Sequence, residues 1–350
     1  MMNERQQKRK DEHLHLAEQL YHESHALSGV RFIHQSLPEI SLDEVSLHTS
    51  FGVLSFDCPF FINAMTGGSR HSQQINERLA KIAAQTHLAI ASGSLSAAIK
   101  NEALIPTFST LRQHHSGIVI ANIGAEHSVQ NAQKAIDILQ ADALQIHINT
   151  TQELIMPEGG RSFHWLNNIQ KIVQHCSCPV IVKEVGFGMS RETLVQLQSI
   201  GVQYVDISGR GGTNFAAIEN KRQSQPFMEL NDWGLSTAES LLDNQNMQSV
   251  MHLCASGGIQ SPLDVAKCLS LGAEIVGISG YFLHYLLHHT DEETINEIKR
   301  WQQELKLIMT LVGARSPQEL TQAPLLLDTS LSHWCQARDI DWRSFAQRRL

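Results

Sequence analysis

Short apolar runs alternate with amphipathic segments along most of this chain. The apolar runs are nearly continuous, which is typical of strands that are buried on both faces of a parallel sheet. The segments between them have helical periodicity. Eight repeats of a strand followed by a helix favour a sheet that closes into a (β/α)8 barrel. The expected strands are 60–64, 88–91, 118–121, 143–148, 180–185, 204–207, 250–254 and 275–278, and the clearest helical segments are 74–86, 128–140, 191–200 and 262–271.

The main structural alternative is an open, doubly wound α/β sheet. That fold commonly binds a dinucleotide at a G-x-G-x-x-G turn after its first strand. No such turn follows the run at 60–64, and the count of eight units suits a closed barrel better. We therefore predict an α/β protein with a TIM-barrel fold.

The residues before the first strand form an extension of a different character. Residues 1–27 have the pattern of a polar helix with a basic cluster, Arg5, Lys8, Arg9 and Lys10, followed by Asp11-Glu12-His13. Taken alone, this pattern favours a solvated helix that frays. Residues 28–57 are expected to be extended, with a hairpin whose arms are 45–49 and 53–56 around Ser50-Phe51-Gly52. The predicted division is an N-terminal extension at 1–57 and a barrel with C-terminal helices at 58–350.

Composition excludes several classes of protein. Hydrophobic residues make up 42% of the 350 residues, which is enough for a large core, and the formal net charge of −8 argues against nucleic-acid binding. The six cysteines include no C-x-x-C pair, and Cys176-x-Cys178 lacks a second pair to complete a zinc site. We find neither a signal peptide nor an apolar run of membrane-spanning length. A soluble cytoplasmic protein is expected.

The ends of the predicted strands carry the informative residues. In a (β/α)8 barrel these ends meet on one face, where active sites lie. Lys183 ends the fifth run, where an unpaired buried charge would be costly, so a functional role is favoured. Residues 209–213 (Gly-Arg-Gly-Gly-Thr) follow the sixth run, and backbone amides in such a loop can bind an anion.

Two further strand ends predict a phosphate site. Residues 256–258 (Ser-Gly-Gly) follow the seventh run, where Ser261 can cap a helix that starts at Pro262, and Ser279-Gly280 follow the eighth. The loops after strands seven and eight form the usual phosphate site of this fold. A phosphorylated cofactor or substrate is expected there.

The loop after the fourth run, residues 147–153 (His-Ile-Asn-Thr-Thr-Gln-Glu), predicts a second polar site. His147 and Asn149 occupy alternate positions, so both can point into the mouth of the barrel. The Glu153 carboxylate next to neutral polar groups suits Mg²⁺, which takes few protein ligands and shares oxygens with phosphates. By position alone, Glu153 could equally be a solvated loop acid.

Together these motifs resemble the type 2, FMN-dependent isopentenyl-diphosphate isomerases. The resemblance extends over almost the whole chain and keeps the order of the motifs. The matching pieces are Arg9-Lys10 with His13, Met65-Thr66-Gly67-Gly68, Ser94, Asn122, His147-x-Asn149-x-x-Gln152-Glu153, Lys183-Glu184-Val185-Gly186, Gly211-Gly212-Thr213 with Glu219 and Arg222, Ser256-Gly257-Gly258-Ile259, and Ser279-Gly280.

The resemblance implies an isomerase of isoprenoid biosynthesis that interconverts isopentenyl and dimethylallyl diphosphate by a 1,3-proton shift. It implies reduced FMN, NADPH to prime the flavin, Mg²⁺ held by Glu153, and a homo-oligomer, tetramer or octamer, with no nucleic-acid or membrane partner. Implied FMN contacts are Ala64, Met65, Thr66, Ser94, Asn122, Lys183, Thr213, Gly257, Gly258, Ile259, Ser279 and Gly280. Implied substrate contacts are Arg9, Lys10, His13, Ser94, Leu95, Ser96, His147, Asn149 and Gln152.

We expect Gln152 and Glu219 to lie beside the flavin as the catalytic side chains. Gln152 has no useful pKa and would orient a proton or a water molecule. Burial in the mouth is expected to raise the pKa of Glu219 toward neutrality. A carboxylate that stabilises the start of a helix is the structural alternative for Glu219.

Three positions depart from the family pattern. Leu95 stands where the family usually has Gln, which removes a polar side chain near the substrate. Phe215 stands where many members have Trp, so an aromatic wall remains without an indole donor. Gln260 stands where Arg is common, and the phosphate would depend more on backbone amides.

Other functions are less well supported by the sequence. A 2-hydroxy-acid oxidase on an FMN barrel needs a His base and Arg residues at the strand ends, and no such pair is evident near the last strands. A dehydrogenase of the inosinate type needs a nucleophilic Cys after the sixth strand, and residues 209–215 contain none. A flavin-binding sensor or scaffold without catalysis would not need His147, Gln152 and Glu219 on one rim.

Overall fold

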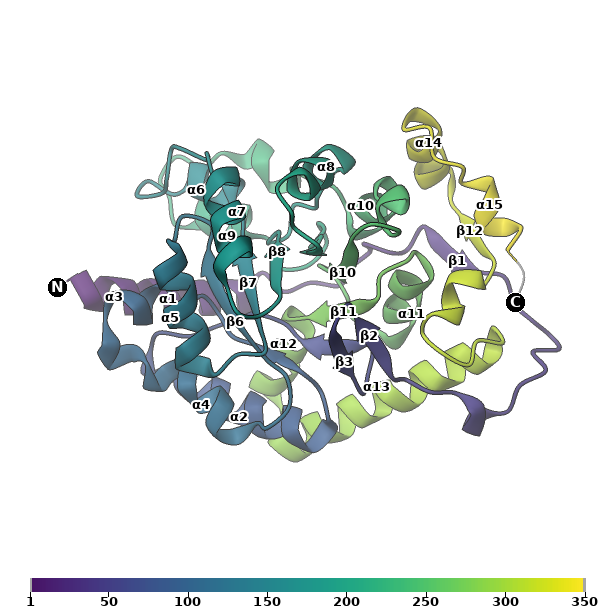
Figure 1. Ribbon diagram of the computed structural model, residues 1–350, viewed down its shortest axis with the longest axis horizontal. Coiled ribbons are helices and arrows are strands. Elements are labelled where there is room, and N and C mark those ends of the chain that lie inside the picture. The colour runs from purple at the N-terminus through teal and green to yellow at the C-terminus, as the bar shows by residue number, and fades with distance from the viewer. Residues whose placement is uncertain (1, 349–350) are drawn as a thin grey trace.

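A computed structural model describes residues 2–348, with side chains from residue 10 onward. Its centre is a closed barrel of parallel strands in the order β10-β11-β4-β5-β6-β7-β8-β9 (Figure 1). The predicted (β/α)8 barrel is confirmed, and each of the eight predicted runs overlaps a barrel strand. The strands are β4 (Phe60–Ile62), β5 (Ile90–Ala91), β6 (Val119–Gly124), β7 (Ala143–His147), β8 (Val180–Lys183), β9 (Tyr204–Asp206), β10 (His252–Ser256) and β11 (Ile275–Ile278).

Helices cover the outside of the barrel because each strand faces apolar side chains on both of its sides. Every residue of β4, β6, β8 and β11 is buried, for example. Ser261 caps α11 with Pro262 in its first turn, as predicted. The helices of this outer ring are α2 (Arg70–Thr86), α4 (Pro106–His114), α5 (Val129–Leu139), α7 (Leu166–His175), α8 (Arg191–Ser199), α10 (Thr237–Asp243), α11 (Pro262–Ser270) and α13 (Asp291–Leu311).

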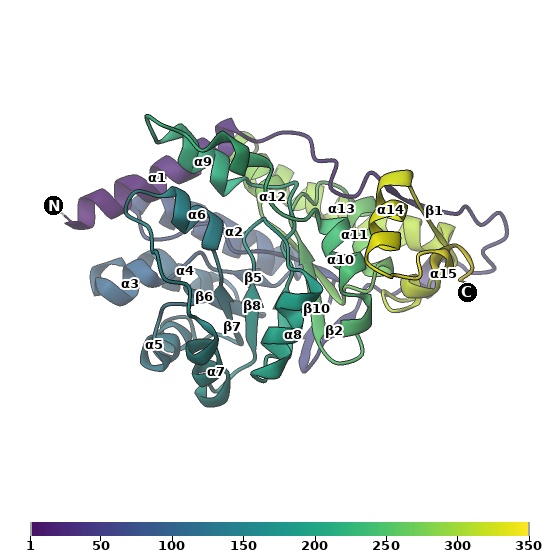
Figure 2. The ribbon, with the colours of Figure 1, turned by 90° about the horizontal axis from the view of Figure 1, so that it is seen from above.

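Shorter helices follow the carboxyl ends of several strands and build the mouth of the barrel. They are α3 (Ser96–Lys100), α6 (Thr150–Ile155), α9 (Phe215–Lys221) and α12 (Gly280–His288). The N-terminal helix α1 (Met2–Gln19) lies beside α9 in the view from above (Figure 2). The polar helix predicted for the N-terminus is therefore present, and residues 10–18 make contacts with the mouth rather than extending freely into solvent.

A hairpin closes the opposite end of the barrel. Its strands are β2 (Thr49–Phe51) and β3 (Leu54–Phe56), so the predicted first arm at 45–49 is wrong and the turn lies at Gly52-Val53. Phe51 is buried and packs edge-on against Tyr204 at the start of β9. Gly52 has a φ of +56° and no room for a side chain beside the Tyr204 ring. These two contacts fix the register of the hairpin.

Two strands that are far apart in the sequence pair on the outside of the barrel. Strand β1 (Val30–Phe32) pairs antiparallel with β12 (Leu325–Leu327), and the helices α14 (Thr329–Ala337) and α15 (Arg343–Ala346) follow it (Figure 1). This pairing was not predicted from the sequence. The predicted division at residue 57 stays a prediction.

Candidate active site

A buried ion pair occupies the carboxyl ends of β8, β9 and β10. The Lys183 ammonium lies 2.9 Å from an Asp206 carboxylate oxygen, and the side chains are 8% and 0% exposed. Lys183 also donates to the Ser256 hydroxyl at 3.3 Å, and that hydroxyl donates to Asp206 at 2.6 Å. The cost of an unpaired buried charge at Lys183 is therefore avoided, because the neighbouring strand supplies a carboxylate. The pair holds the ammonium in place inside the barrel.

A chain of amide side chains extends this pair across the barrel. Asp206 accepts from the Asn63 amide at 2.8 Å, and Asn63 accepts from Gln145 at 2.9 Å. Gln145 in turn accepts from Asn122 at 3.0 Å, and the Asn122 oxygen lies 2.9 Å from Nδ1 of His147. These side chains come from β4, β6, β7 and the segments that continue them. Two residues of the predicted site, Asn122 and His147, are thus connected to a third, Lys183.

The neutral form of His147 is favoured by its surroundings. Burial lowers its pKa to about 4; the Glu126 carboxylate opposes this shift, and the positive charges of Lys10 and Lys183 add to it. Because Asn122 donates its N–H to Gln145, its oxygen accepts from the Nδ1–H of His147. The ring can then donate through Nε2 to an anion only after it takes up a proton.

A second polar cluster joins Glu219 of α9 to α6 and α1. Gln152 of α6 donates to Glu219 at 2.6 Å, and Nε2 of His13 in α1 lies 2.9 Å from the same oxygen. The other carboxylate oxygen pairs with Arg222. Asn149 caps α6 and donates to the oxygen of the Gln152 amide. The structure thus brings the two predicted catalytic residues into direct contact.

The prediction that the pKa of Glu219 is raised toward neutrality is wrong. Burial alone would raise it, but hydrogen bonds from His13 and Gln152 and the positive charge of Arg222 together hold the pKa below its usual value. Hydrogen bonds to the ionised form of a carboxyl group favour that form. Glu219 is therefore a carboxylate at neutral pH.

The strand-end loops predicted to bind FMN also converge. Ser279 donates to the Ala64 carbonyl at 3.4 Å, and Gly280 approaches the Thr213 hydroxyl. Gly212 faces the Gly258 amide so closely that a Cβ at Gly212 would lie 2.7 Å from that nitrogen. Of the remaining predicted contacts, Met65 is half-buried after β4, Thr66 and Ile259 are buried, and Gly257 has a φ of +96°.

These residues fit a phosphorylated flavin. Gly257 and Gly258 leave the loop after β10 without side chains, and Ser279-Gly280 places the start of α12 beside it. Helix starts of this kind favour phosphate. The Ser92 hydroxyl and the Arg210 Nε are buried near these strand ends without a hydrogen-bond partner among the described residues. Lys183 adds a buried cation deeper in the mouth.

The remaining predicted substrate contacts lie on α1 and in the segment after β5. Nζ of Lys10 lies 3.5 Å from the Ser94 carbonyl. The hydroxyls of Ser94 and Ser96 are 2.9 Å apart, and Ser96 also contacts the His127 ring at 2.7 Å. The side chain of Arg9 lies outside the described residues.

Glu153 lies in the first turn of α6, where its carboxylate accepts from the Gly160 amide at 2.6 Å. Among the described residues, a group of three potential metal ligands occurs at Glu18, His284 and His288, and Glu153 is not part of it. A single carboxylate still suits Mg²⁺ when a phosphorylated substrate supplies further oxygens. The residues present are compatible with that arrangement.

The comparisons with known proteins agree with this geometry. Residues 109–327, more than half of the chain, match the family of FMN-dependent dehydrogenases. The chain is 47% identical over 339 residues to the isopentenyl-diphosphate delta-isomerase of Latilactobacillus sakei subsp. sakei (strain 23K), with 96% of this chain and 97% of that protein covered. It is 44% identical over 352 residues to the protein of the same name from Listeria monocytogenes serotype 4a (strain HCC23), with 98% of each covered.

The chain belongs to the isopentenyl-diphosphate delta-isomerase family. The match to FMN-dependent dehydrogenases assigns it to the FMN-dependent, type 2 branch, and it is an enzyme. Solved structures of flavocytochrome b2 and mandelate oxidase share the barrel, with TM-scores of 0.64 and 0.62. They are 18% and 15% identical, and they cover 92% and 91% of this chain and 84% and 92% of their own. At that identity they show the fold alone.

The three departures from the pattern of this isomerase family have distinct structural consequences. Leu95 is fully buried in the core and its amide donates to the Asn122 carbonyl, so we do not retain its side chain as a substrate contact. Phe215 is half-buried at the start of α9 and packs against the cluster of Ile155, Phe187 and Ala216. Gln260 binds the chain that follows α1, accepting from the Ser24 amide at 2.8 Å. It supports the N-terminal segment.

Sequence reasoning missed Asn63, Gln145, Asp206 and His127. The first three are polar side chains inside otherwise apolar strands or directly after one, and all three are essentially inaccessible to solvent. A buried polar residue in such a run needs a partner, and this is the signal that could have identified them. His127 follows β6 and pairs with Ser96, as described above.

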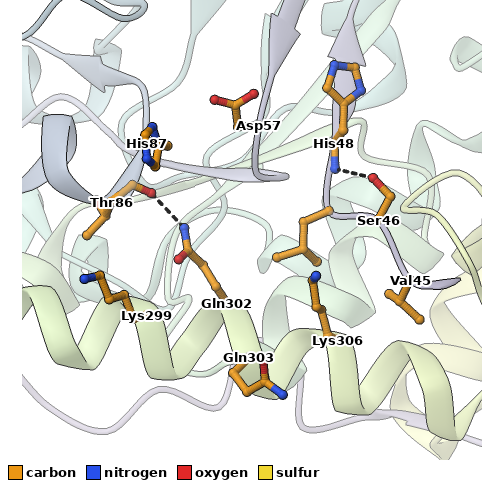
Figure 3. A pocket seen from close by; sticks show the side chains of 11 residues that line it. Val45, Ser46, His48, Asp57, Thr86, His87, Lys299, Gln302, Gln303 and Lys306 are labelled. Carbon is orange, nitrogen blue, oxygen red and sulfur yellow. Dashed lines mark hydrogen bonds between the residues drawn. The ribbon is translucent and has the colours of Figure 1, made fainter. Parts of the chain in front are cut away.

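The largest hollow that we describe lies at the opposite end of the barrel (Figure 3). Its volume is about 720 Å³, and it is lined by residues that precede barrel strands, including Asp57 and His87, and by Lys299 and Lys306 of α13. Gln302 donates to the Thr86 carbonyl across it at 2.9 Å. Residues at this end of such barrels serve stability rather than catalysis.

No helix among the described residues is both long and apolar enough to cross a membrane.

We expect the stability of the flavin-free protein to depend on the protonation of His147. The unfolded chain takes up this proton near pH 6.5, whereas the folded chain does so only near pH 4. The stability that the neutral ring contributes is complete above pH 6.5 and is lost as the pH falls toward 4. In urea unfolding, the free-energy gap between the wild type and His147→Gln should shrink over this interval. A gap that stays constant would contradict this assignment, and the surface change His164→Gln serves as the control.

Proposed function

We propose that this protein interconverts isopentenyl diphosphate and dimethylallyl diphosphate by a 1,3-proton shift, with reduced FMN and Mg²⁺, as part of isoprenoid biosynthesis. The observation that carries the proposal is the contact of Gln152 and Glu219 on the rim of a flavin-type barrel. The names of the relatives supply the substrate pair. The two diphosphates differ only in the position of one double bond, so their interconversion involves no net redox change. It requires one proton to be added to one carbon and another to be removed from a second carbon.

The chain supplies the groups that would hold FMN. The glycines of the loops after β9 and β10 and the start of α12 would bind the phosphate, and Lys183 would face negative charge on the ring. When bound and reduced, the flavin would supply an electron-rich surface beside the substrate. We further propose NADPH as the reductant that primes it. The predicted homo-oligomer and the cytoplasmic location stay predictions.

Glu219 is the group we assign to proton transfer. It rests as a carboxylate, so it can accept a proton from the substrate without being activated first. Gln152 cannot titrate, but its amide holds one Glu219 oxygen at 2.6 Å and its own oxygen is fixed by Asn149. Both carboxylate oxygens therefore have defined positions. Once protonated, Glu219 can return the proton to the carbon at the other end of the three-carbon unit, as a 1,3-shift requires.

The substrate diphosphate would be held from two sides. Helix α1 brings Lys10 and His13 to the rim, 3.5 Å from Ser94 and 2.9 Å from Glu219 respectively. Glu153 would contribute one oxygen to Mg²⁺ on the other side. A cationic helix that closes over an anion explains why a basic cluster occurs in a chain of net charge −8.

Replacing Glu153 by Gln tests the magnesium site. The amide oxygen can still accept from Gly160, but the charge is gone, so we expect the Mg²⁺ concentration for half-maximal turnover to rise by about tenfold or more. The FMN content should stay unchanged. Glu229→Gln removes an exposed acid from a nearby surface helix and should behave like the wild type. An unchanged Mg²⁺ titration for Glu153→Gln would remove this residue from the site.

Protein loaded with FMN can be used to distinguish the proposed function from 2-hydroxy-acid oxidation. Anaerobic protein reconstituted with FMN should keep its flavin oxidised in the presence of lactate or mandelate, because the loop after β10 carries no His or Arg to bind a 2-hydroxy acid. After reduction it should convert isopentenyl diphosphate. Bleaching of the flavin by a 2-hydroxy acid, without isomerisation, would favour the oxidase.

A further inference from the structure

Three potential metal ligands converge where α1 meets α12, outside the cluster around Glu219. His284 and His288 are four residues apart on α12, so they lie on one face of that helix. Glu18 lies near the end of α1. One Glu18 oxygen is 2.7 Å from Nδ1 of His284 and 2.7 Å from Nε2 of His288. The function proposed above does not use any of these residues.

The donor atoms of the three side chains are arranged around one point. All three lie within 4.8 Å of one another, and ligand atoms around a tetrahedral Zn²⁺ are about 3.3 Å apart, as its bond lengths of about 2.0–2.1 Å require. Small side-chain rotations would bring the three atoms to this spacing, and the two 2.7 Å contacts of the Glu18 oxygen would lengthen. Two imidazoles and one carboxylate leave a fourth position open for water.

The surroundings also favour an ordered site. The ring of Tyr21 stacks on the His284 ring, with centroids 4.0 Å apart and planes 9° from parallel. This contact fixes the orientation of one imidazole, as groups outside the ligand set do in known metal sites. The three side chains are 24–54% exposed, so an ion has access from solvent.

We propose that Glu18, His284 and His288 bind a divalent transition-metal ion, with Zn²⁺ as the best match, and that the ion fastens α1 to α12. Imidazole nitrogen is a poor ligand for Mg²⁺, which prefers oxygen, and a good one for Zn²⁺. The site is therefore separate in chemistry from the one assigned to Glu153. Without an ion, both rings compete for a single carboxylate oxygen; a metal satisfies all three groups together.

The proposed metal site joins two helices that contribute to the mouth of the barrel. Helix α1 also carries Lys10 and His13 onto the rim, and α12 begins at the proposed phosphate site. Figure 2 shows α1 lying along this side of the molecule, with α12 near its end. An ion between the two helices would reduce the freedom of α1 to leave the mouth.

Metal binding can be measured on the FMN-loaded protein without substrate, so the result does not depend on the proposed reaction. We would titrate Co²⁺ and Zn²⁺ in a buffer with excess Mg²⁺. One equivalent of Co²⁺ should give visible d–d bands of a low-coordinate nitrogen and oxygen site, without thiolate charge-transfer bands, and Zn²⁺ should displace it. His288→Ala should weaken this binding at least tenfold, and His289→Ala, which removes a neighbouring exposed histidine, should not.

Equal Co²⁺ affinity in the wild type and His288→Ala, or cobalt–thiolate bands, would overturn the site. The fastening of α1 is tested separately by hydrogen exchange of residues 2–19. Exchange should slow when Zn²⁺ is added to the wild type and should stay unchanged in Glu18→Gln. Exchange that does not slow in the wild type would overturn the fastening of α1. Both variants alter surface side chains, and their retained flavin content would confirm that they are folded.

Discussion

Replacing Glu219 by Gln is expected to lower kcat for isomerisation by roughly 10²- to 10⁴-fold, the range that a group in general acid–base catalysis supplies. The amide keeps the shape of the side chain and can still accept from Gln152, but it cannot take up a proton. FMN binding should be unaffected, because Glu219 lies among α1, α6 and α9 rather than in the phosphate loops. Product formation under saturating substrate, together with flavin content, measures both effects.

Glu12→Gln provides the matched control for this change. Glu12 lies 3.1 Å from Arg222, which also binds Glu219. Both variants therefore remove one acidic partner of the same guanidinium, but only one of them removes the proposed proton acceptor. We expect Glu12→Gln to change kcat by no more than a few fold. Similar losses in the two variants would assign the effect to Arg222 and remove the catalytic role from Glu219.

Breaking the pair of Lys183 and Asp206 is expected to have the largest effect on stability. Asp206→Asn would place an amide group against the donors Lys183, Asn63 and Ser256, and would leave the ammonium buried without its counter-charge. Breaking a buried pair in this way costs about 3–5 kcal/mol. Urea unfolding of the flavin-free protein should show this loss, and the double variant with Lys183→Met should lose less than the sum of the two single changes.

Lys183→Met should also affect the flavin itself. The attraction of one ammonium for one negative charge at 4 Å is roughly 4 kcal/mol at an effective dielectric constant of 20, so reduction of bound FMN should become harder by at most that amount, or FMN should be lost. Lys267→Met is the control, because Lys267 is a buried lysine of α11 that donates to the Leu27 carbonyl away from the mouth. If Lys183→Met binds and reduces FMN like the wild type, the assignment of Lys183 is wrong.

The barrel was predictable because each of its strands can be recognised from its local sequence. A run such as 118–121 is apolar on both sides, and small or polar residues end each run. The register of the hairpin was not predictable in the same way: Thr49–Phe51 forms the first arm because Phe51 packs against Tyr204, a residue that is distant in the sequence. The pairing of β1 with β12 depends on an even longer separation.

The site shows the same limit at the level of single side chains. Lys183 could be singled out because a cation is costly in an apolar strand, but its partner Asp206 depends on which strands become neighbours. The pKa of Glu219 was predicted in the wrong direction for the same reason. Burial can be inferred from a pattern, whereas the donors that outweigh it, His13 and Gln152, come from other elements.

The central claim is that this chain moves a double bond with a flavin that is reduced once and not consumed. The most direct measurement is to supply anaerobic protein with FMN, Mg²⁺, isopentenyl diphosphate and a small amount of NADPH, and to follow dimethylallyl diphosphate by NMR. The account predicts no product before NADPH is added and many molecules of product for each NADPH afterwards. Absence of product with fully reduced, FMN-loaded protein, or product formed only in proportion to NADPH, would contradict it.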